Sequence, residues 1–288
     1  MKFVSYNIQY SKGKDGKYDL ERIADAVRGA DIIGLQEVAR NFPEAPDADQ
    51  PARLAELFPD YYWSYASPVD VDLGSAIIDG KATSHRLEFG YMILSRWPIT
   101  SKRLLLLPRV GSVEDFDIQN GALETIINHL DGPFRVYVTH LNALRSATRL
   151  KQLDWLVSKL FAVTSEGACL SGDQWKGINI PDTPKSFIVL GDFNLAPDSE
   201  EYDRIVGKSD YYHGRVVTNE HWVDTWTRAG HNEDNSETWF DEEDGVKTGL
   251  RLDYGFVSPD LATKITSASI DKENPASDHQ PYWFELDL

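Results

Sequence analysis

Short runs of apolar residues recur along the whole chain, and most have the length and composition of β-strands. The predicted strands are residues 3–8, 31–35, 61–65, 89–94, 122–127, 134–139, 187–190, 254–257 and 282–286. Between some of them the apolar residues return at helical spacing, which predicts helices over residues 20–27 and 150–160 and a third helix after Pro197. Because strands and helices are mixed with no long linker, the pattern predicts one α/β domain over residues 1–288.

Three segments between these elements are predicted to be loops: residues 41–51, 165–184 and 232–249. The first two combine prolines with Asp, Asn or Gly, and the third is acidic with glycine and aromatic residues. Loops of this length in a compact domain are more often functional than idle.

Polar and ionisable residues stand where the predicted buried strands begin or end. They are Asn7, Gln36, Glu37, His140, Asp192, Asn194, Asp253, Asp278 and His279. Taken singly, each has an ordinary structural explanation, such as a turn residue, a helix cap or a histidine with satisfied hydrogen bonds. Their shared position favours a common role, because ligands of α/β sheets gather outside strand ends, where side chains converge on one crevice.

The chemistry of this set suits a metal-assisted reaction at a phosphate. Glu37, Asn7 and a further Asp offer the carboxylate and amide oxygens that Mg²⁺ prefers. Two histidines can transfer protons near neutral pH, while Asp192 and Asn194 can position water and donate hydrogen bonds to a phosphate. No Cys/His cluster indicates zinc, and no glycine-rich loop followed by Lys-Ser/Thr indicates a nucleotide P-loop. The predicted cofactor is Mg²⁺ or Mn²⁺, and the predicted ligand is a phosphorylated substrate.

Composition narrows the choice of partners and location. The 46 acidic and 29 basic residues give a net charge of −17, with no cluster of Lys and Arg, which disfavours duplex DNA without excluding it. The single Cys169 cannot form an internal disulfide, the N-terminal residues resemble a strand rather than a secretory signal, and no apolar run reaches the ~20 residues of a membrane helix. We therefore expect a cytoplasmic protein without a transmembrane segment; its oligomeric state is left open.

Short motifs spread over almost the whole chain resemble, in order, those of the endonuclease/exonuclease/phosphatase superfamily, which includes deoxyribonuclease I, exonuclease III-type enzymes and neutral sphingomyelinases. The motifs are Tyr6-Asn7-Ile8, Leu35-Gln36-Glu37-Val38, the Ile-Leu-Ser-Arg-Trp-Pro-Ile of residues 93–99, Val138-Thr139-His140-Leu141, Gly191-Asp192-Phe193-Asn194, Arg251-Leu252-Asp253-Tyr254 and Ser277-Asp278-His279. The resemblance implies an α/β fold, a four-layer sandwich of two packed mixed β-sheets flanked by helices, with the site at one end of the sheets.

The resemblance also implies roles for individual residues. Glu37 is similar to the main metal ligand of the family, helped by Asn7 and Asp278. Asp192 is similar to the residue that orients or deprotonates the attacking water, and Asn194 to the residue that holds the phosphate.

Two histidines have implied partners. Asp253 would pair with His279 and fix its tautomer, so that the imidazole contacts phosphate or water. His140 resembles the histidine that protonates the leaving oxygen in the deoxyribonuclease and sphingomyelinase branches, with Glu88 as its candidate partner.

For several side chains the sequence leaves both a functional and a structural role open. Arg145 and Arg149 follow His140 and either meet the phosphate or, for Arg149, anchor a helix. Aromatic residues either wall a substrate pocket or pack in the core; they are Trp63, Trp175, Trp222, Trp226 and Trp239.

The sequence therefore predicts a metal-dependent phosphoesterase acting on a small, lipid or sugar-linked substrate. A Mg²⁺-dependent nuclease on DNA or RNA is the alternative, although the segment at residues 138–141 lacks the Tyr-x-Pro-Asn type of pattern expected in abasic-site endonucleases. A non-catalytic module is disfavoured because the catalytic set is complete, and a glycoside hydrolase because two carboxylates would suffice for it.

Overall fold

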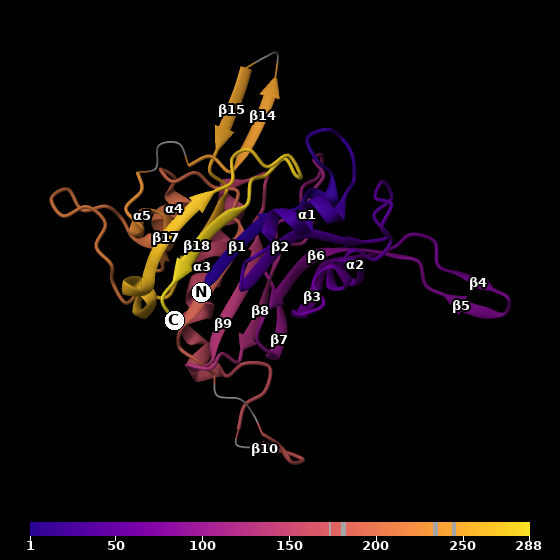
Figure 1. Cartoon of the computed structure of the whole chain (residues 1–288), viewed down its shortest axis with the longest axis horizontal. Coiled ribbons are helices and arrows are strands. Elements are labelled where there is room, and N and C mark those ends of the chain that lie inside the picture. The colour runs from indigo at the N-terminus through magenta and orange to yellow at the C-terminus, as the bar shows by residue number, and fades with distance from the viewer. Residues whose placement is uncertain (173, 180–182, 233–235, 244–245) are drawn as a thin grey trace.

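The computed structural model describes residues 1–172, 174–179, 183–232, 236–243 and 246–288. Within these ranges the chain forms two mixed sheets of six strands each (Figure 1). In spatial order, the first sheet consists of β17 (Ile265–Ile270), β18 (Tyr282–Leu286), β1 (Lys2–Asn7), β2 (Ile32–Arg40), β6 (Arg86–Ser95) and β3 (Tyr62–Asp72). The second consists of β13 (Val223–Asp224), β16 (Asp253–Val257), β12 (Phe187–Asp192), β9 (Phe134–His140), β8 (Gly121–Ile127) and β7 (Ile99–Leu106).

The sheets pack face to face, and helices cover their outer faces. Phe3 and Ile93 of the first sheet lie in one buried cluster with Val138 and Leu190 of the second. The opposite face of the first sheet packs on α1 (Leu20–Val27) and α2 (Gln50–Leu57), and that of the second on α3 (Ser146–Glu166) and α4 (Glu200–Val206). The predicted four-layer sandwich of two packed mixed sheets is therefore confirmed.

Two parallel strand pairs set the position of the functional residues. Strand β1 runs parallel to β2 with α1 between them in the chain, and β9 runs parallel to β12 with α3 between them. Such crossovers bring the carboxyl ends of the paired strands to one edge. Asn7 consequently stands opposite Gln36, and His140 opposite Asp192; the antiparallel strand β16 places Asp253 across from Asp192.

Several element boundaries differ from the sequence prediction. Strands β7 and β17 were not predicted, because both are edge strands that alternate between partly buried and exposed residues. Strand β2 continues beyond the predicted end at Leu35 to Arg40, and helix α2 begins inside the predicted loop 41–51.

The other two predicted loops contain short hairpins. These are β10 (Gln174–Trp175) with β11 (Ile178–Asn179), and β14 (Trp239–Glu243) with β15 (Val246–Leu250). Residues 173, 180–182, 233–235 and 244–245 of these predicted loops lie outside the described residues.

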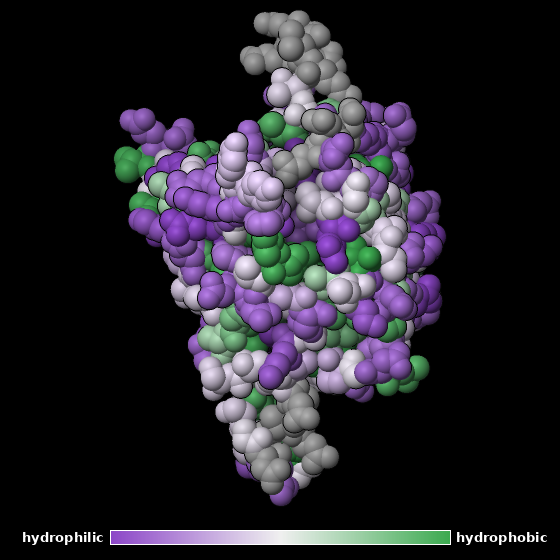
Figure 2. All heavy atoms as spheres, turned by 90° about the vertical axis from the view of Figure 1, so that its left-hand side faces the viewer, coloured by the Kyte–Doolittle hydropathy of each residue, from purple (hydrophilic) through white to green (hydrophobic). Residues whose placement is uncertain are grey.

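The remaining elements are short. They are the 3-10 segments η1 (Gln9–Ser11) and η2 (Pro259–Lys264), the helix α5 (Thr225–Arg228), and the hairpin of β4 (Ala76–Ile78) and β5 (Lys81–Thr83). The face over α5 and β17 is mostly hydrophilic (Figure 2), in keeping with the net charge of −17. No helix in the described part of the chain is both long and apolar enough to cross a membrane.

Candidate active site

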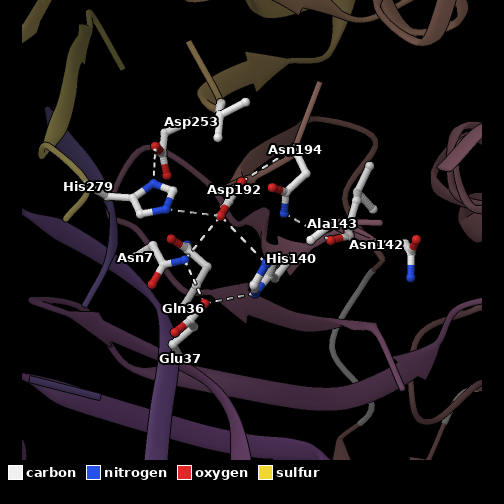
Figure 3. Close-up of polar contacts among 12 residues, drawn as sticks. Asn7, Gln36, Glu37, His140, Asn142, Ala143, Asp192, Asn194, Asp253 and His279 are labelled. Carbon is white, nitrogen blue, oxygen red and sulfur yellow. Dashed lines mark hydrogen bonds and ion pairs between the residues drawn. The ribbon is translucent and has the colours of Figure 1, made fainter. Parts of the chain in front are cut away.

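Asp192, the last residue of β12, lies at the centre of a group of polar side chains (Figure 3). Its Oδ2 accepts a hydrogen bond from Asn7 Nδ2 at 3.0 Å and lies 3.5 Å from His140 Nε2 and 3.6 Å from His279 Nε2. Its Oδ1 accepts the backbone N–H of Asn194 at 3.0 Å. One carboxylate thus touches residues from the ends of both sheets.

Glu37 reaches this group from inside a strand, not from a strand end as predicted. The pairing of β2 with β6 shifts register between Gln36 and Val38, and Glu37 has a φ of 58°. Such a bulge re-aims a side chain, and here Glu37 Oε1 accepts from Asn7 Nδ2 at 3.0 Å and lies 3.8 Å from His140 Nδ1. Burial raises the pKa of Glu37, although His140 and Asn7 act in the opposite direction.

Asp253 and His279 form a close buried pair, with Asp253 Oδ2 2.7 Å from His279 Nδ1. Burial alone would disfavour a charged imidazole, but the carboxylates of Asp253 and Asp192 more than offset it and raise the pKa of His279 well above its usual value. Burial also raises the pKa of Asp253, with the charge of His279 opposing the shift. The opposite charges of the two groups therefore favour a strong hydrogen bond between His279 Nδ1 and the Asp253 carboxylate.

Thr238 holds the backbone that carries this pair. The sequence pattern did not predict a role for Thr238 in the site. The buried Thr238 Oγ1 accepts the backbone N–H groups of both Leu252 and Asp253 at 3.0 Å. The carbonyl of Thr238 accepts from the N–H of Gln280, the residue after His279, at 2.6 Å. One residue therefore ties together the two segments that supply Asp253 and His279.

Asp278 lies beside the polar group around Asp192, and its carboxylate is held by two neighbouring side chains. Its Oδ2 accepts from Gln9 Nε2 at 3.0 Å and its Oδ1 accepts from Ser277 Oγ at 3.1 Å. Its charge is one of the smaller influences raising the pKa of Glu37, which places the two carboxylates within electrostatic reach of each other.

Glu88 is not the partner of His140, which corrects the sequence prediction. Glu88 lies within β6 directly across from Arg40 of β2, and the two side chains form an ion pair at 3.1 Å. The carboxylates beside His140 are those of Glu37 and Asp192 instead.

The two arginines after His140 also have structural partners. Arg149 Nη2 bonds to Glu201 Oε1 at 3.0 Å and joins α3 to α4, so the helix-anchoring reading is the one that the contacts favour. Arg145 contacts the carbonyl of Val110 and lies 3.6 Å from Asp117. Neither arginine lines the cavity beside the polar group, so the expected phosphate contact is not supported.

A cavity of about 500 Å³ opens beside the polar group, a volume within the ~300–1,000 Å³ range of small-molecule sites. Its polar end is formed by Glu37, His140, Asp192, Asn194 and His279. Much of the remaining lining is apolar, and it includes the aromatic rings of Tyr10, Phe42, Phe89 and Phe116. Of the two readings of the tryptophans, core packing holds for Trp222 and Trp226. Trp63, Trp175 and Trp239 do not line this cavity, although the backbone of Trp239 bridges to that of His279. A larger hollow of about 860 Å³ between α3 and α4 contains none of the predicted site residues.

A protein-family model matches nearly the whole chain. Residues 4–279 match the model of the Endonuclease/Exonuclease/phosphatase family. The chain belongs to this family. The resemblance predicted from the motifs is thus confirmed, while no curated protein matches the sequence.

Solved structures of family members share the fold at low sequence identity. An endonuclease/exonuclease/phosphatase from Beutenbergia cavernae has 20% identity and a TM-score of 0.67, with 100% of this chain and 71% of that chain covered. A mannosyl-6-phosphatase from Bacteroides thetaiotaomicron has 20% identity and a TM-score of 0.66, with both chains covered completely, 100% each. TDP2 from C. elegans has 16% identity and a TM-score of 0.60, covering 99% of this chain and 75% of that one. At these identities the likeness shows the fold alone.

Proposed function

We propose that this chain is a phosphoesterase that uses Mg²⁺ or Mn²⁺ to hydrolyse a phosphomonoester or phosphodiester of a small, lipid or sugar-linked molecule, with residues 1–288 acting as one catalytic domain. The observation that carries the proposal is the position of Asp192. Its carboxylate lies within 3.6 Å of two histidines and borders a cavity of about 500 Å³. Phosphoryl transfer needs such positioning and charge neutralisation more than it needs covalent help.

The donor set fits a hard divalent cation. Carboxylates converge here, and Asn7 Nδ2 donates to Glu37 and Asp192 at 3.0 Å. The Oδ1 of Asn7, which accepts the N–H of Gln9 at 3.0 Å, is the oxygen that this residue would offer to the ion. Asp192, Asp253 and His279 also have potential ligand atoms within 4.8 Å of one another. His279 Nδ1 is already hydrogen-bonded to Asp253 at 2.7 Å, and Nε2 lies 3.6 Å from Asp192 Oδ2, so we assign the metal to Glu37, Asn7 and Asp278. When bound, the ion supplies charge neutralisation at the phosphate and at the leaving oxygen.

The protein groups around the metal position supply proton transfer and orientation. Asp192, whose two oxygens are held by Asn7 and by the N–H of Asn194, orients or deprotonates the attacking water. His279 donates to a phosphate oxygen through Nε2, while the Asn194 side chain binds another phosphate oxygen. His140 protonates the leaving oxygen, and acid–base help of this kind contributes ~10²–10⁴-fold.

A small substrate fits the charge distribution better than duplex DNA. No Lys or Arg lines the cavity in the part of the chain that the structure describes, and the net charge is −17. A duplex contacted at several phosphates needs matching cations. The nuclease reading is therefore the second candidate, and a cytoplasmic location stays a prediction from the sequence.

The test is a panel of phosphomonoesters, phosphodiesters, phospholipids and single- and double-stranded nucleic acids, assayed with Mg²⁺ and with Mn²⁺. Glu37→Gln should lower turnover by about 10²-fold or more and abolish the rise in Tm that the ion causes in the wild type. Glu88→Gln is the matched control, because Glu88 bonds to Arg40 away from the site, and it should keep both properties. Full turnover in excess chelator would contradict the proposal.

A further inference from the structure

The cavity beside the polar group has an apolar wall built from segments far apart in the sequence. The rings of Tyr10 and Phe42 stack with centroids 4.0 Å apart, and Phe89 lies 6.2 Å from Phe42. Val69 of β3 and Leu87 of β6 extend this wall along the cavity. Glu37 lines the same cavity, and its charge helps to raise the pKa of Tyr10, so the wall adjoins the reacting end.

The cavity lining also includes an aromatic ring that the fold leaves largely uncovered. Phe116 lines the cavity and is 88% exposed. The next residue, Asp117, is held by Asn142 Nδ2 at 2.7 Å and lies 3.6 Å from Arg145, so the segment is tied to the cavity rim. An exposed large aromatic side chain beside an apolar wall is characteristic of a surface that a ligand covers.

Two arginines that follow or pair with residues next to the lining are already paired with carboxylates. Arg40 bonds to Asp49 at 2.9 Å and to Glu88 at 3.1 Å, and Arg145 lies beside Asp117. A second phosphate or another anionic group on the substrate would meet carboxylates and apolar side chains here. Leaving such a group without a partner costs more than an uncharged apolar group would.

We propose that the apolar wall of Tyr10, Phe42 and Phe89, together with Phe116, binds the ester group of the substrate. The substrate class is then an ester with a single phosphate whose organic group is uncharged and apolar, either aromatic or aliphatic. Sugar phosphates and polyphosphorylated molecules are poor substrates on this proposal. This inference rests on the proposed function, because it takes the phosphate to lie at Asp192 and His279.

The experiment compares esters that differ only in apolar size. Ethyl, hexyl and 2-phenylethyl esters, each as the monophosphate and as the methyl phosphodiester, have leaving alcohols of similar acidity. Each buried methylene contributes up to about fourfold, so kcat/KM should rise about tenfold or more from ethyl to hexyl. Glucose 6-phosphate should react no faster than ethyl phosphate.

The same series is then measured on variants. Phe89→Ala and Phe116→Ala should flatten the dependence on ester size, whereas Phe89→Leu should keep most of it. Because Phe116 is 88% exposed, Phe116→Ala should leave the fold intact. The test therefore remains informative even if Phe89→Ala is unstable. Tyr212→Ala, an aromatic residue that is 84% exposed and absent from the cavity lining, is the matched control and should behave as wild type.

Equal kcat/KM for the ethyl and hexyl esters, or a preference for the sugar phosphate, overturns this inference while the phosphoesterase function stands. If the wild type hydrolyses none of the panel, the proposed function fails, and calorimetry of ethyl- and hexylphosphonate tests the wall by itself. Tighter binding of hexylphosphonate by the wild type but not by Phe116→Ala supports the wall. Equal affinities overturn it.

Discussion

The two ends of the cavity are built in different ways. The polar end stands on or next to strand ends and on the bulge of β2, and most of its side chains are buried: His140 is 7%, Asp192 1% and His279 6% exposed. The apolar end combines strand residues such as Val69 and Leu87 with rings in turns and loops, and it includes Phe116 at 88% exposure. Rigid elements hold catalytic groups with the precision that chemistry needs, whereas loops on such a scaffold carry the contacts that select a ligand. The comparison indicates that the polar end controls the rate of reaction and the apolar end controls which substrate reacts.

The largest expected effect is at the centre of the polar end. Asp192→Asn should lower kcat by ~10²–10⁴-fold with little change in KM, because the lost carboxylate acts on the water mainly in the transition state. Steady-state kinetics on the best substrate of the panel measures this. Thermal unfolding should show a folded variant, and a change confined to KM would contradict the division between the two ends.

A smaller effect on kcat is expected at Thr238, which supports the backbone of Asp253 without lining the cavity. Thr238→Val removes the hydroxyl that accepts the N–H groups of Leu252 and Asp253 while keeping the shape of the side chain. Supporting hydrogen bonds of this kind typically contribute ~10–100-fold to activity, so kcat should fall by about tenfold while KM stays unchanged.

The conservative replacement separates positioning from stability. Thr238→Ser keeps the hydroxyl and should restore kcat even if its Tm is lowered. Loss of kcat in both variants in proportion to their loss of stability would show that Thr238 only supports the fold.

The smallest catalytic effect is expected at Arg149. Its guanidinium bonds to Glu201, whose side chain is 5% exposed, and to the carbonyl of Asn142. Arg149→Ala removes the charged partner of Glu201, which keeps its hydrogen bond with Ser146. The free energy of unfolding should therefore fall by about 2 kcal/mol, while KM stays unchanged. Denaturant unfolding and kinetics measure the two quantities. A raised KM without loss of stability would instead support the hypothesis that Arg149 binds the phosphate of the substrate.

The succession of strands along the chain, and the residue types at their ends, could be predicted from the sequence, because both depend on local pattern. Alternation along residues 3–8 and the continuous apolar run of residues 187–190 mark buried strands, and Asn7 and Asp192 stand at or just after them. Parallel strands joined by a helix must end at the same edge. The convergence of the polar group was therefore predictable before any contact was known.

Only the tertiary structure decided which side chains touch. Glu88 faces Arg40 rather than His140 because the register of β2 against β6 sets their pairing, and that register includes a bulge that no local pattern revealed. The ring stack of Tyr10 and Phe42 joins residues 32 positions apart, and Thr238 reaches Asp253 across 15 positions. Apolar periodicity reports whether a residue is buried, but the neighbour that buries it is fixed by how the sheets and loops pack.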